Sequence, residues 1–524
     1  MCSQDAQTSR QTTEQAASSS GIERPPQPKP QKWIRRDTPK VKAEKFMWKD
    51  PVARPKFLTD NLNPIDFLEL FLDDDIIDEL CDNSATYARE NDRAFDISRE
   101  EFRGFLGALW LTGYAGPPRK RLIWSIDQDV RVPMIAENIS RNRFDDVLKN
   151  VHISSVIRDN NPDDKFHKVR LLISHMNEKS LMFFVPQQNL SVDESMIPYY
   201  GKHGCKQFIK GKPIRYGFKF WCLTTSEGYM VQFEPYQGAG TGRKVEGLGM
   251  GGSVVVDLMS ELPPDLPFHV TCDNLFTSVK LIEYMTWWGK GITGTMRKNR
   301  VEQCPLTKTG FDKKPRGTFE FFHDKNNSAT ICQWNDNSQV IVGTNASSVH
   351  PIHTAKRWSA AAHEQIIVDQ PCMIKHYNMT MGGVDRMDQN IANYRIGIRI
   401  RKWWWPVFAF LLDVAVHQAW QLYRKSEQPA MDLLEFRRYI VKGYLTKCGA
   451  VRQRVGRPLA VKGLQRMKED KRVLPAIRYD RVDHHVGMSQ TQLRCGFCHK
   501  KTRRLCTKCN RGLHEWCFAA YHKK

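Results

Sequence analysis

Aspartates stand at the ends of two apolar runs that are far apart in the chain. Asp193 follows Leu190 and Val192. Asp273 directly follows residues 268–272, in which apolar side chains alternate with others. This alternation predicts two half-buried strands. Because adjacent strands of a sheet lie about 4.8 Å apart, carboxylates at two such strand ends can share a pair of hard cations.

A second pair of carboxylates opens a stretch with helical character. Asp385 and Asp388 are three residues apart, so they lie on one side of the helix expected from about Gly383. Two divalent ions about 3.5–4 Å apart can activate an attacking hydroxyl and neutralise the leaving oxygen of a phosphodiester. Oxygen ligands select Mg²⁺ or Mn²⁺. One aspartate at a strand end or helix start is usually a cap or turn residue, so the prediction depends on the combination.

Cysteine and histidine residues near the C-terminus come in pairs at the spacing of zinc ligands. The expected ligands are Cys495, Cys498, Cys506, Cys509, His514, Cys517 and His522. Seven ligands cannot complete two tetrahedral sites, and the upstream candidates for the eighth are His484 and His485. In a cross-brace, one ion takes the first and third pairs, and the other takes the second pair, His522 and the upstream histidine. Few apolar residues accompany them, so two structural Zn²⁺ ions must supply most of the folding free energy here.

The charge of the chain indicates an anionic partner. Its 524 residues include 79 Lys+Arg and 57 Asp+Glu, which gives a net charge of +22. Such a surplus attracts polyanions, and nucleic acid is favoured over an anionic membrane surface because no lipidation motif or basic amphipathic helix is evident. The most apolar run, Trp403–Trp420, contains Asp413, His417 and Pro406, so we expect a buried helix and no membrane association.

The apolar pattern predicts elements of two kinds. Helical spacing runs through residues 64–156, where Ser98 and Glu101 form a capping box, and helices return at about 383–445. Between them we expect strands at 189–192, 216–224, 229–236, 268–272 and 292–296, with helices at 247–262 and 276–288. Three strands, a helix, a strand, a helix and a strand form an RNase H-like order. Residues 301–365 look like an insertion into this α/β core.

Two basic segments are candidate DNA contacts. Lys206, Lys210 and Lys212 alternate with aromatic residues in the run 200–219, just after Asp193. An ordinary surface hairpin, with lysines that protect an exposed edge, is the alternative. Residues 437–482 contain 14 Lys+Arg and 3 Asp+Glu, which fits either a solvated linker or an arm that follows DNA.

Three blocks in this order, SVDES, TCDNLFTS and YNMTMGGVDRMDQ, resemble the catalytic blocks of the piggyBac transposase family. The resemblance runs from about Phe67 to the C-terminus. It implies that Asp193, Asp273, Asp385 and Asp388 are the catalytic metal ligands, because none of the family's aspartates is substituted. It further implies a nuclear enzyme that cuts transposon ends, forms hairpins with the freed 3′ hydroxyl and rejoins DNA at TTAA sites.

The same resemblance assigns further roles. Arg297, Lys298 and Arg300 match a basic loop that touches transposon-end DNA, and Arg401 and Lys402 precede a Trp-Pro block of the family. His485 is the preferred eighth zinc ligand, by similarity to a histidine before the family's cysteine-rich tail, which binds end DNA. His514 stands where relatives often carry Cys. A homodimer or larger assembly is expected, because two transposon ends must be held together.

The expected domains follow from these assignments. They are a disordered arm (1–45), a helical dimerisation and DNA-binding domain (46–187), a first core part (188–300), an insertion (301–365), a second core part (366–395), C-terminal helices that join the helical domain (396–450), a basic linker (451–483) and a zinc domain (484–524). Two other functions remain open. One is a transposase-derived protein that binds DNA without cutting it, and the other is a zinc cross-brace adaptor; the intact aspartates count against both.

Overall fold

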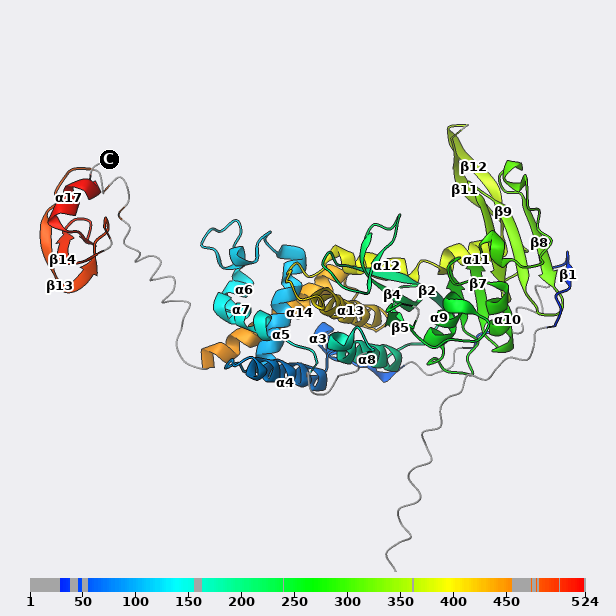
Figure 1. The fold of residues 1–524 in the computed structure, drawn as a ribbon, viewed down its shortest axis with the longest axis horizontal. Helices are drawn as coiled ribbons and strands as arrows, with labels where there is room; N and C mark the ends of the chain where they lie inside the picture. Colours follow the sequence, from blue (N-terminus) through cyan, green and yellow to red (C-terminus); the bar gives the residue numbers. More distant parts are fainter. Residues whose placement is uncertain are drawn as a thin grey trace, which may run out of the picture. The chain divides into compact units, whose positions relative to one another are not determined.

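The chain forms two compact units, Met1–Cys448 and Gly449–Lys524 (Figure 1). The computed structural model describes residues 29–37, 46–49, 55–154, 163–238, 240–360, 362–454, 473, 477, 480–498 and 500–522. Most of the predicted linker 451–483 lies outside these ranges. Its first residues are helical, because the preceding helix continues to Arg454.

The first unit begins with helices, as the apolar spacing predicts. They are α2 (Lys56–Thr59), α3 (Pro64–Glu69), α4 (Asp74–Glu90), α5 (Arg99–Ala115), the 3₁₀ helix η1 (Lys120–Trp124), α6 (Pro133–Asn138), α7 (Arg141–Asn150) and α8 (His167–Met182). Ser98 caps α5 by accepting a hydrogen bond from the Glu101 backbone N–H. The Glu101 carboxylate pairs instead with Arg143 of α7, so the return bond of a capping box is replaced by an interhelical ion pair.

Two long helices late in the chain are α13 (Trp405–Tyr423) and α14 (Leu433–Arg454). Nearly every side chain of α13 is buried, which confirms the buried helix expected there. It contains Asp413, whose carboxylate pairs with the equally buried Arg437 of α14 at 2.5 Å and accepts the Ile396 backbone N–H. Among the described residues, no helix is both long and apolar enough to span a bilayer.

The central sheet has the predicted RNase H-like arrangement. Its core strands are β2 (Asn189–Pro198), β4 (Tyr216–Thr225), β5 (Met230–Pro235), β6 (His269–Cys272) and β7 (Gly291–Thr295). They lie in the order β5-β4-β2-β6-β7, with β6 parallel to both β2 and β7 and the other pairs antiparallel. The connecting helices are α9 (Gly249–Met259) and α10 (Val279–Trp287), and the short strand β3 (Lys206–Phe208) pairs with β4.

The segment predicted as an insertion extends this sheet. Strands β8 (Phe319–Asp324), β9 (Thr330–Asn335) and β10 (Gln339–Thr344) form an antiparallel group, and β10 pairs with β7 (Figure 1). The hairpin of β11 (Ile352–Ser359) and β12 (Glu364–Pro371) follows, so the predicted boundary at 365/366 falls inside a strand. Short 3₁₀ helices η2 (Lys298–Arg300) and η3 (Phe311–Lys313) precede the group. Helices α11 (Cys372–Thr380) and α12 (Gly383–Asn393) return the chain to the core.

Part of the segment expected as a disordered arm is ordered. Strand β1 (Trp33–Ile34) pairs with β8, and the Asp37 carboxylate accepts the backbone N–H groups of Val349 and His350. The expectation of disorder is therefore wrong for residues 29–37. Their low apolar content is offset by main-chain pairing to a sheet edge, which composition does not reveal.

The second unit is small and poor in apolar residues. It comprises β13 (Val486–Arg494), β14 (Lys501–Cys506), β15 (Arg511–Gly512) and α17 (Glu515–His522). Its buried cluster consists of Cys495, Cys506, Cys509, Cys517, Leu513 and Tyr521. Four cysteines and two other side chains cannot provide the core of a stable domain, so another source of folding free energy is needed.

Candidate functional site

Two of the four aspartates are placed side by side by strand pairing. Val192 of β2 pairs with Cys272 of the parallel strand β6, and Asp193 and Asp273 each come one residue later. Asp273 directly follows β6, as predicted, whereas Asp193 is not at a strand end, because β2 continues to Pro198 beyond its pairing with β6. The predicted proximity of Asp193 and Asp273 thus follows directly from this register.

Helix α12 brings Asp388 to the same strand. The Ser195 hydroxyl donates a 2.6 Å hydrogen bond to the Asp388 carboxylate, and Ser195 lies two residues after Asp193, on the same face of β2. Asp385 precedes Asp388 by three residues on α12. The helix can start this close to the sheet because it begins at Gly383, where a Cβ would lie 2.3 Å from the Thr225 carbonyl oxygen.

The four carboxylates differ in exposure: Asp193 is buried, Asp273 and Asp388 are partly exposed, and Asp385 is exposed. Burial raises the pKa of Asp193 to about 7, with a further increase from the charges of Glu194 and Asp273. Burial raises the pKa of Asp388 to about 6, although the Ser195 hydrogen bond opposes this shift. The pKa of Asp273 is also raised, first by burial. These groups are held in a place that disfavours their own charge, which is the environment that a bound cation would relieve.

The lysine Lys212, in a loop outside these strands, interacts electrostatically with the carboxylates. Burial lowers the pKa of Lys212, but the charges of Asp193, Glu194, Asp385 and Asp388 outweigh it and raise the pKa overall. Lys212 lies in the loop between β3 and β4. This loop therefore comes within interaction distance of Asp193, Glu194, Asp385 and Asp388. The sequence predicted Lys212 as a DNA contact only.

Two residues of the site were not predicted. Ser195 holds Asp388, and its position two residues after Asp193 could have placed it on the same strand face. Glu194 lies between Asp193 and Ser195 and projects from the opposite face of β2, but in addition to burial its charge raises the pKa of Asp193 and Asp273, and its buried Oε2 atom has no hydrogen-bond partner among the described residues. A buried, unpartnered carboxylate oxygen is costly unless a cation or donor joins it.

The predicted DNA-contacting residues fall into two groups. Lys210, Arg297, Lys298 and Arg401 are exposed, and Lys206 is partly exposed. Arg300 instead donates to the Leu275 carbonyl at 2.7 Å and so braces the loop after Asp273. The Lys402 ammonium donates to the carbonyls of Lys149 and Val151, and burial lowers its pKa to about 8. The side chains of Arg300 and Lys402 thus form hydrogen bonds inside the protein, which their sequence context could not show.

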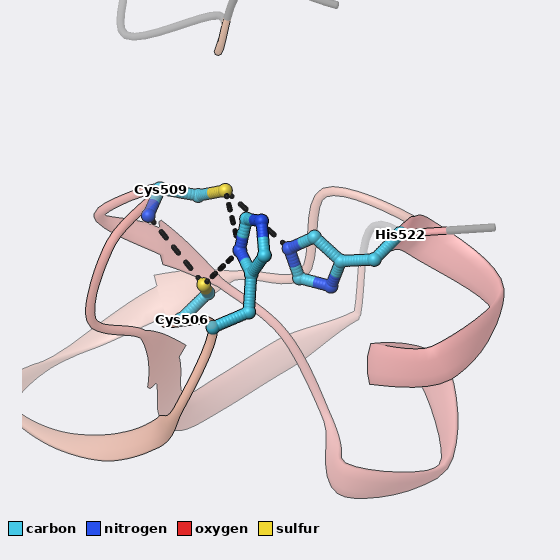
Figure 2. Close-up of side chains that lie close together, drawn as sticks. Cys506, Cys509 and His522 are labelled. Carbon is cyan, nitrogen blue, oxygen red and sulfur yellow. Dashed lines mark hydrogen bonds between the residues drawn. The ribbon is translucent and has the colours of Figure 1, made fainter. Parts of the chain in front are cut away.

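The cysteines and histidines of the second unit form two groups of four. His484, Cys506, Cys509 and His522 make one group, and Cys495, Cys498, His514 and Cys517 make the other. Within each group the candidate ligand atoms lie within 4.8 Å of one another. This is the cross-braced grouping predicted from the spacing, and Figure 2 shows Cys506, Cys509 and His522 turned toward one another.

The eighth member of these groups is His484 and not His485, so the preference for His485 is wrong. The His484 Nδ1 atom lies 3.3 Å from the Cys506 sulfur and 3.4 Å from the Cys509 sulfur. The backbone carbonyl of His485 instead accepts the Thr507 N–H. Neighbouring residues of an extended segment point in opposite directions, so only one of the two histidines can face the cysteines.

The geometry of both groups fits tetrahedral zinc. Sulfur and nitrogen ligands at about 2.3 and 2.0 Å from one ion would be separated by about 3.5 Å. The Cys509–His522 and Cys498–His514 contacts are both 3.3 Å. The second ring nitrogen of each histidine is also occupied: His484 meets Asp480, His514 the Lys501 carbonyl, and His522 the Phe518 carbonyl. Such outer partners fix the orientation of metal-binding imidazoles.

The aspartates converge more loosely than these ligands. Among the described residues, the two Cys/His groups are the sets of three or more possible ligands found within 4.8 Å, and the four aspartates are not among them. A wider ring of carboxylates suits a pair of ions with water and substrate ligands better than one closed tetrahedral ion.

Comparison with known proteins assigns this chain to a family. Residues 63–420 match the family model described as Transposase IS4. The chain is 39% identical over 474 residues to human PiggyBac transposable element-derived protein 3, covering 89% of this chain and 77% of that protein. It is 36% identical over 504 residues to human PiggyBac transposable element-derived protein 2, covering 94% and 82%. The chain therefore belongs to the piggyBac family of transposases.

The fold agrees with this assignment. It is similar to a cryo-EM structure of the piggyBac transposase synaptic complex with hairpin DNA, with a TM-score of 0.66 and 19% identity. The similarity covers 88% of this chain and 96% of that chain. It therefore extends well beyond the core sheet, and the predicted fold class is confirmed.

Proposed function

We propose that this protein is a metal-dependent DNA transposase whose active site comprises Asp193, Asp273, Asp385 and Asp388. The single observation that carries the proposal is the register of β2 and β6, which sets Asp193 beside Asp273. The Ser195 bond that holds Asp388 to β2 supports it. All four are intact, and burial raises the pKa of three of them. Such clustering of perturbed carboxylates is typical of an active site.

In this proposal the four carboxylates hold two divalent ions, Mg²⁺ or Mn²⁺. When bound, the ions supply activation of a hydroxyl and neutralisation of charge on the phosphodiester. The protein fixes the ligands in advance: strand pairing sets Asp193 and Asp273, and Ser195 orients Asp388. Lys212 adds a positive charge beside the carboxylates, where a DNA phosphate would arrive.

The finer steps are carried over from the family resemblance. The protein would cleave transposon ends, close them as hairpins through the freed 3′ hydroxyl and rejoin the DNA at TTAA sites. Exposed Lys210, Arg297, Lys298 and Arg401 would contact the DNA backbone. The second unit, with two Zn²⁺ ions, would bind end DNA. The active form would be a dimer or larger, acting in the nucleus on double-stranded terminal repeats.

The substitution Asp273→Asn tests this proposal. Removing one metal ligand should lower nicking of end DNA by a factor of at least about 100, while DNA affinity stays within about twofold of wild type. Gel assays of cleavage and binding with Mg²⁺, each on the DNA that flanks the gene for this protein, measure the two effects separately. Asn337→Ala, an exposed neutral change in the turn between β9 and β10, is the control and should leave nicking intact.

The competing function is a DNA-binding protein that no longer cuts. The matching human relatives are named transposable element-derived proteins, which gives this alternative weight. It predicts that wild type and Asp273→Asn bind DNA alike and that neither nicks it. Wild-type nicking that survives the substitution would instead refute the role of these aspartates.

A further inference from the structure

The hairpin that follows the Asp193 strand has an unusual composition. Residues 195–226 contain six Lys or Arg residues and no Asp or Glu. This segment includes the end of β2, the strand β3, the loop 209–215 and β4. The positive charge of this segment, which no acidic residue within it offsets, attracts an anionic partner to the side of the carboxylates.

Two aromatic rings of this hairpin are exposed and paired. Phe208 of β3 and Tyr216 of β4 are opposite one another in the strand register, with ring centroids 4.8 Å apart. Their exposed fractions are 57% and 45%, which is large for aromatic side chains. The Lys206 ammonium lies over the Tyr216 ring, 6.0 Å from its centroid.

Phe218, two residues after Tyr216 on β4, behaves differently. Phe218 is fully buried and packs against Tyr199, His203 and Trp403. The aromatic residues of β4 that pack in the core thus come after its first residue, Tyr216. Phe208 and Tyr216 contribute little to that core, and their exposure has no explanation in the packing of the first unit.

The loop of this hairpin lies close to the active site. The Ile209 backbone N–H donates to the Arg215 carbonyl, so the loop closes directly beyond the aromatic pair. Lys212 within this loop interacts with the charges of Asp193, Asp385 and Asp388. One end of the hairpin thus reaches the carboxylates, and the aromatic pair stands at the base of the same loop.

We propose that Phe208 and Tyr216 form a stacking platform for unpaired bases of the DNA end that the active site processes. An exposed aromatic pair with a lysine over one ring, in a basic segment, fits the flat faces and flanking phosphates of single-stranded DNA. Cleaved or hairpin DNA ends contain such unpaired bases, whereas an intact duplex hides them. The inference rests on the proposed function and adds a recognition surface to it.

The double substitution Phe208→Ala/Tyr216→Ala tests the platform. The probes are a blunt DNA duplex and the same duplex with a four-nucleotide 3′ overhang that carries 2-aminopurine, with Ca²⁺ replacing Mg²⁺ to prevent cleavage. Loss of stacking should weaken binding of the overhang DNA by roughly 5- to 100-fold and abolish the fluorescence change, because each stacked base contributes substantially to affinity. Binding of the blunt duplex should stay within twofold.

Two control variants separate stacking from general damage. Phe208→Tyr/Tyr216→Phe keeps both rings and should bind the overhang as wild type does. Trp358→Ala removes a side chain that is also 57% exposed, on β11, and should change neither affinity. Melting temperatures of all variants within about 2 °C of wild type would show that the fold is retained.

The outcomes are distinguishable. Equal affinity of wild type and the double variant for the overhang, or an equal loss for overhang and blunt duplex, would overturn the platform while leaving the proposed function standing. A loss of self-association in sedimentation, with unchanged affinity for the overhang, would make the rings a contact between copies and would also overturn it. A wild-type protein that binds neither DNA would defeat the proposed function itself.

Discussion

At the scale of single residues, the two predicted metal centres differ in how their ligands are fixed. The Cys and His groups are close-set, and each histidine is oriented through its second ring nitrogen. The aspartates stand farther apart and depend on strand register and one hydroxyl for their positions. The first arrangement suits a permanent structural ion, and the second suits ions that arrive with substrate.

The adjacent histidines 484 and 485 provide a matched test of the zinc assignment. His484→Ala removes a ligand atom from the group with Cys506 and Cys509, so the protein should retain about one Zn²⁺ per chain. His485→Ala leaves both groups complete and should retain about two. Zinc content after dialysis, measured by elemental analysis, gives the result. Equal zinc content in the two variants would contradict the assignment of His484.

The raised pKa of Asp193 makes a prediction about stability without divalent ions. Its folded-state pKa of about 7 exceeds its ordinary value of 3.8, so ionisation costs stability as pH rises from about 4 to 7. Asp193→Asn removes this cost and should raise the melting temperature by about 2–6 °C at pH 8 in EDTA, and by less at pH 5. Thermal unfolding at both pH values tests this. A lower melting temperature at pH 8 would contradict it.

At the scale of elements, α12 and α13 connect the active site to the helical part of the first unit. Helix α12 carries Asp385 and Asp388 on the side of β2, and its Asn390 contacts the buried His417 of α13 at 3.3 Å. Helix α13 is in turn tied to α14 by the Asp413–Arg437 pair, which is almost completely buried. A displacement of α13 is therefore expected to move α12 and, with it, the carboxylates of Asp385 and Asp388.

The buried pair predicts a large effect from a single substitution. Arg437→Met leaves Asp413 buried without its partner and should cost roughly 3–5 kcal/mol of stability. The neighbouring Arg438 is exposed, so Arg438→Met is the control and should cost less than about 0.5 kcal/mol. Urea unfolding followed by tryptophan fluorescence measures both. Asp413→Asn/Arg437→Met should recover part of the loss, because no unpaired charge remains; a double variant as unstable as Arg437→Met would argue against this reason.

At the scale of the whole molecule, the two units have different sources of stability. The first has a large apolar core, whereas the described part of the second buries two apolar side chains, Leu513 and Tyr521, among its cysteines. The positive charge is spread over both: six basic residues lie in the β2–β4 segment, and more lie among the zinc ligands. Such a distribution suits a long anionic partner that contacts several parts of the chain.

Removal of zinc should therefore unfold one unit and spare the other. A strong zinc chelator is expected to make residues 480–522 sensitive to protease, while the region from 55 to 448 stays resistant, because metal binding supplies the folding free energy of the second unit only. Limited proteolysis with mass spectrometry identifies the cleavage sites. Cleavage throughout the first unit after chelation, or protection of both units, would count against separate stabilisation.

The sequence by itself determined the elements and ligand types. Alternating apolar residues located β4, β5, β6 and β7 to within two residues, and located the start of β2 but not its end at Pro198. The position of Asp273 at the end of β6, and the spacing of the paired cysteines, followed from the same local rules, whereas Asp193 lies within β2, which continues to Pro198. The order of these elements was enough to predict the RNase H-like core, since few topologies accommodate it.

Only the tertiary structure decided which side chains meet across long separations in the chain. The choice of His484 over His485 depends on the direction of an extended segment, and the ordering of β1 depends on a free sheet edge nearly 300 residues away. The internal bonds of Arg300 and Lys402, and the approach of Lys212 to the carboxylates, arise from packing between distant segments. Local pattern fixes backbone conformation, but burial and hydrogen bonding are properties of the assembled fold, so they cannot be obtained from neighbouring residues alone.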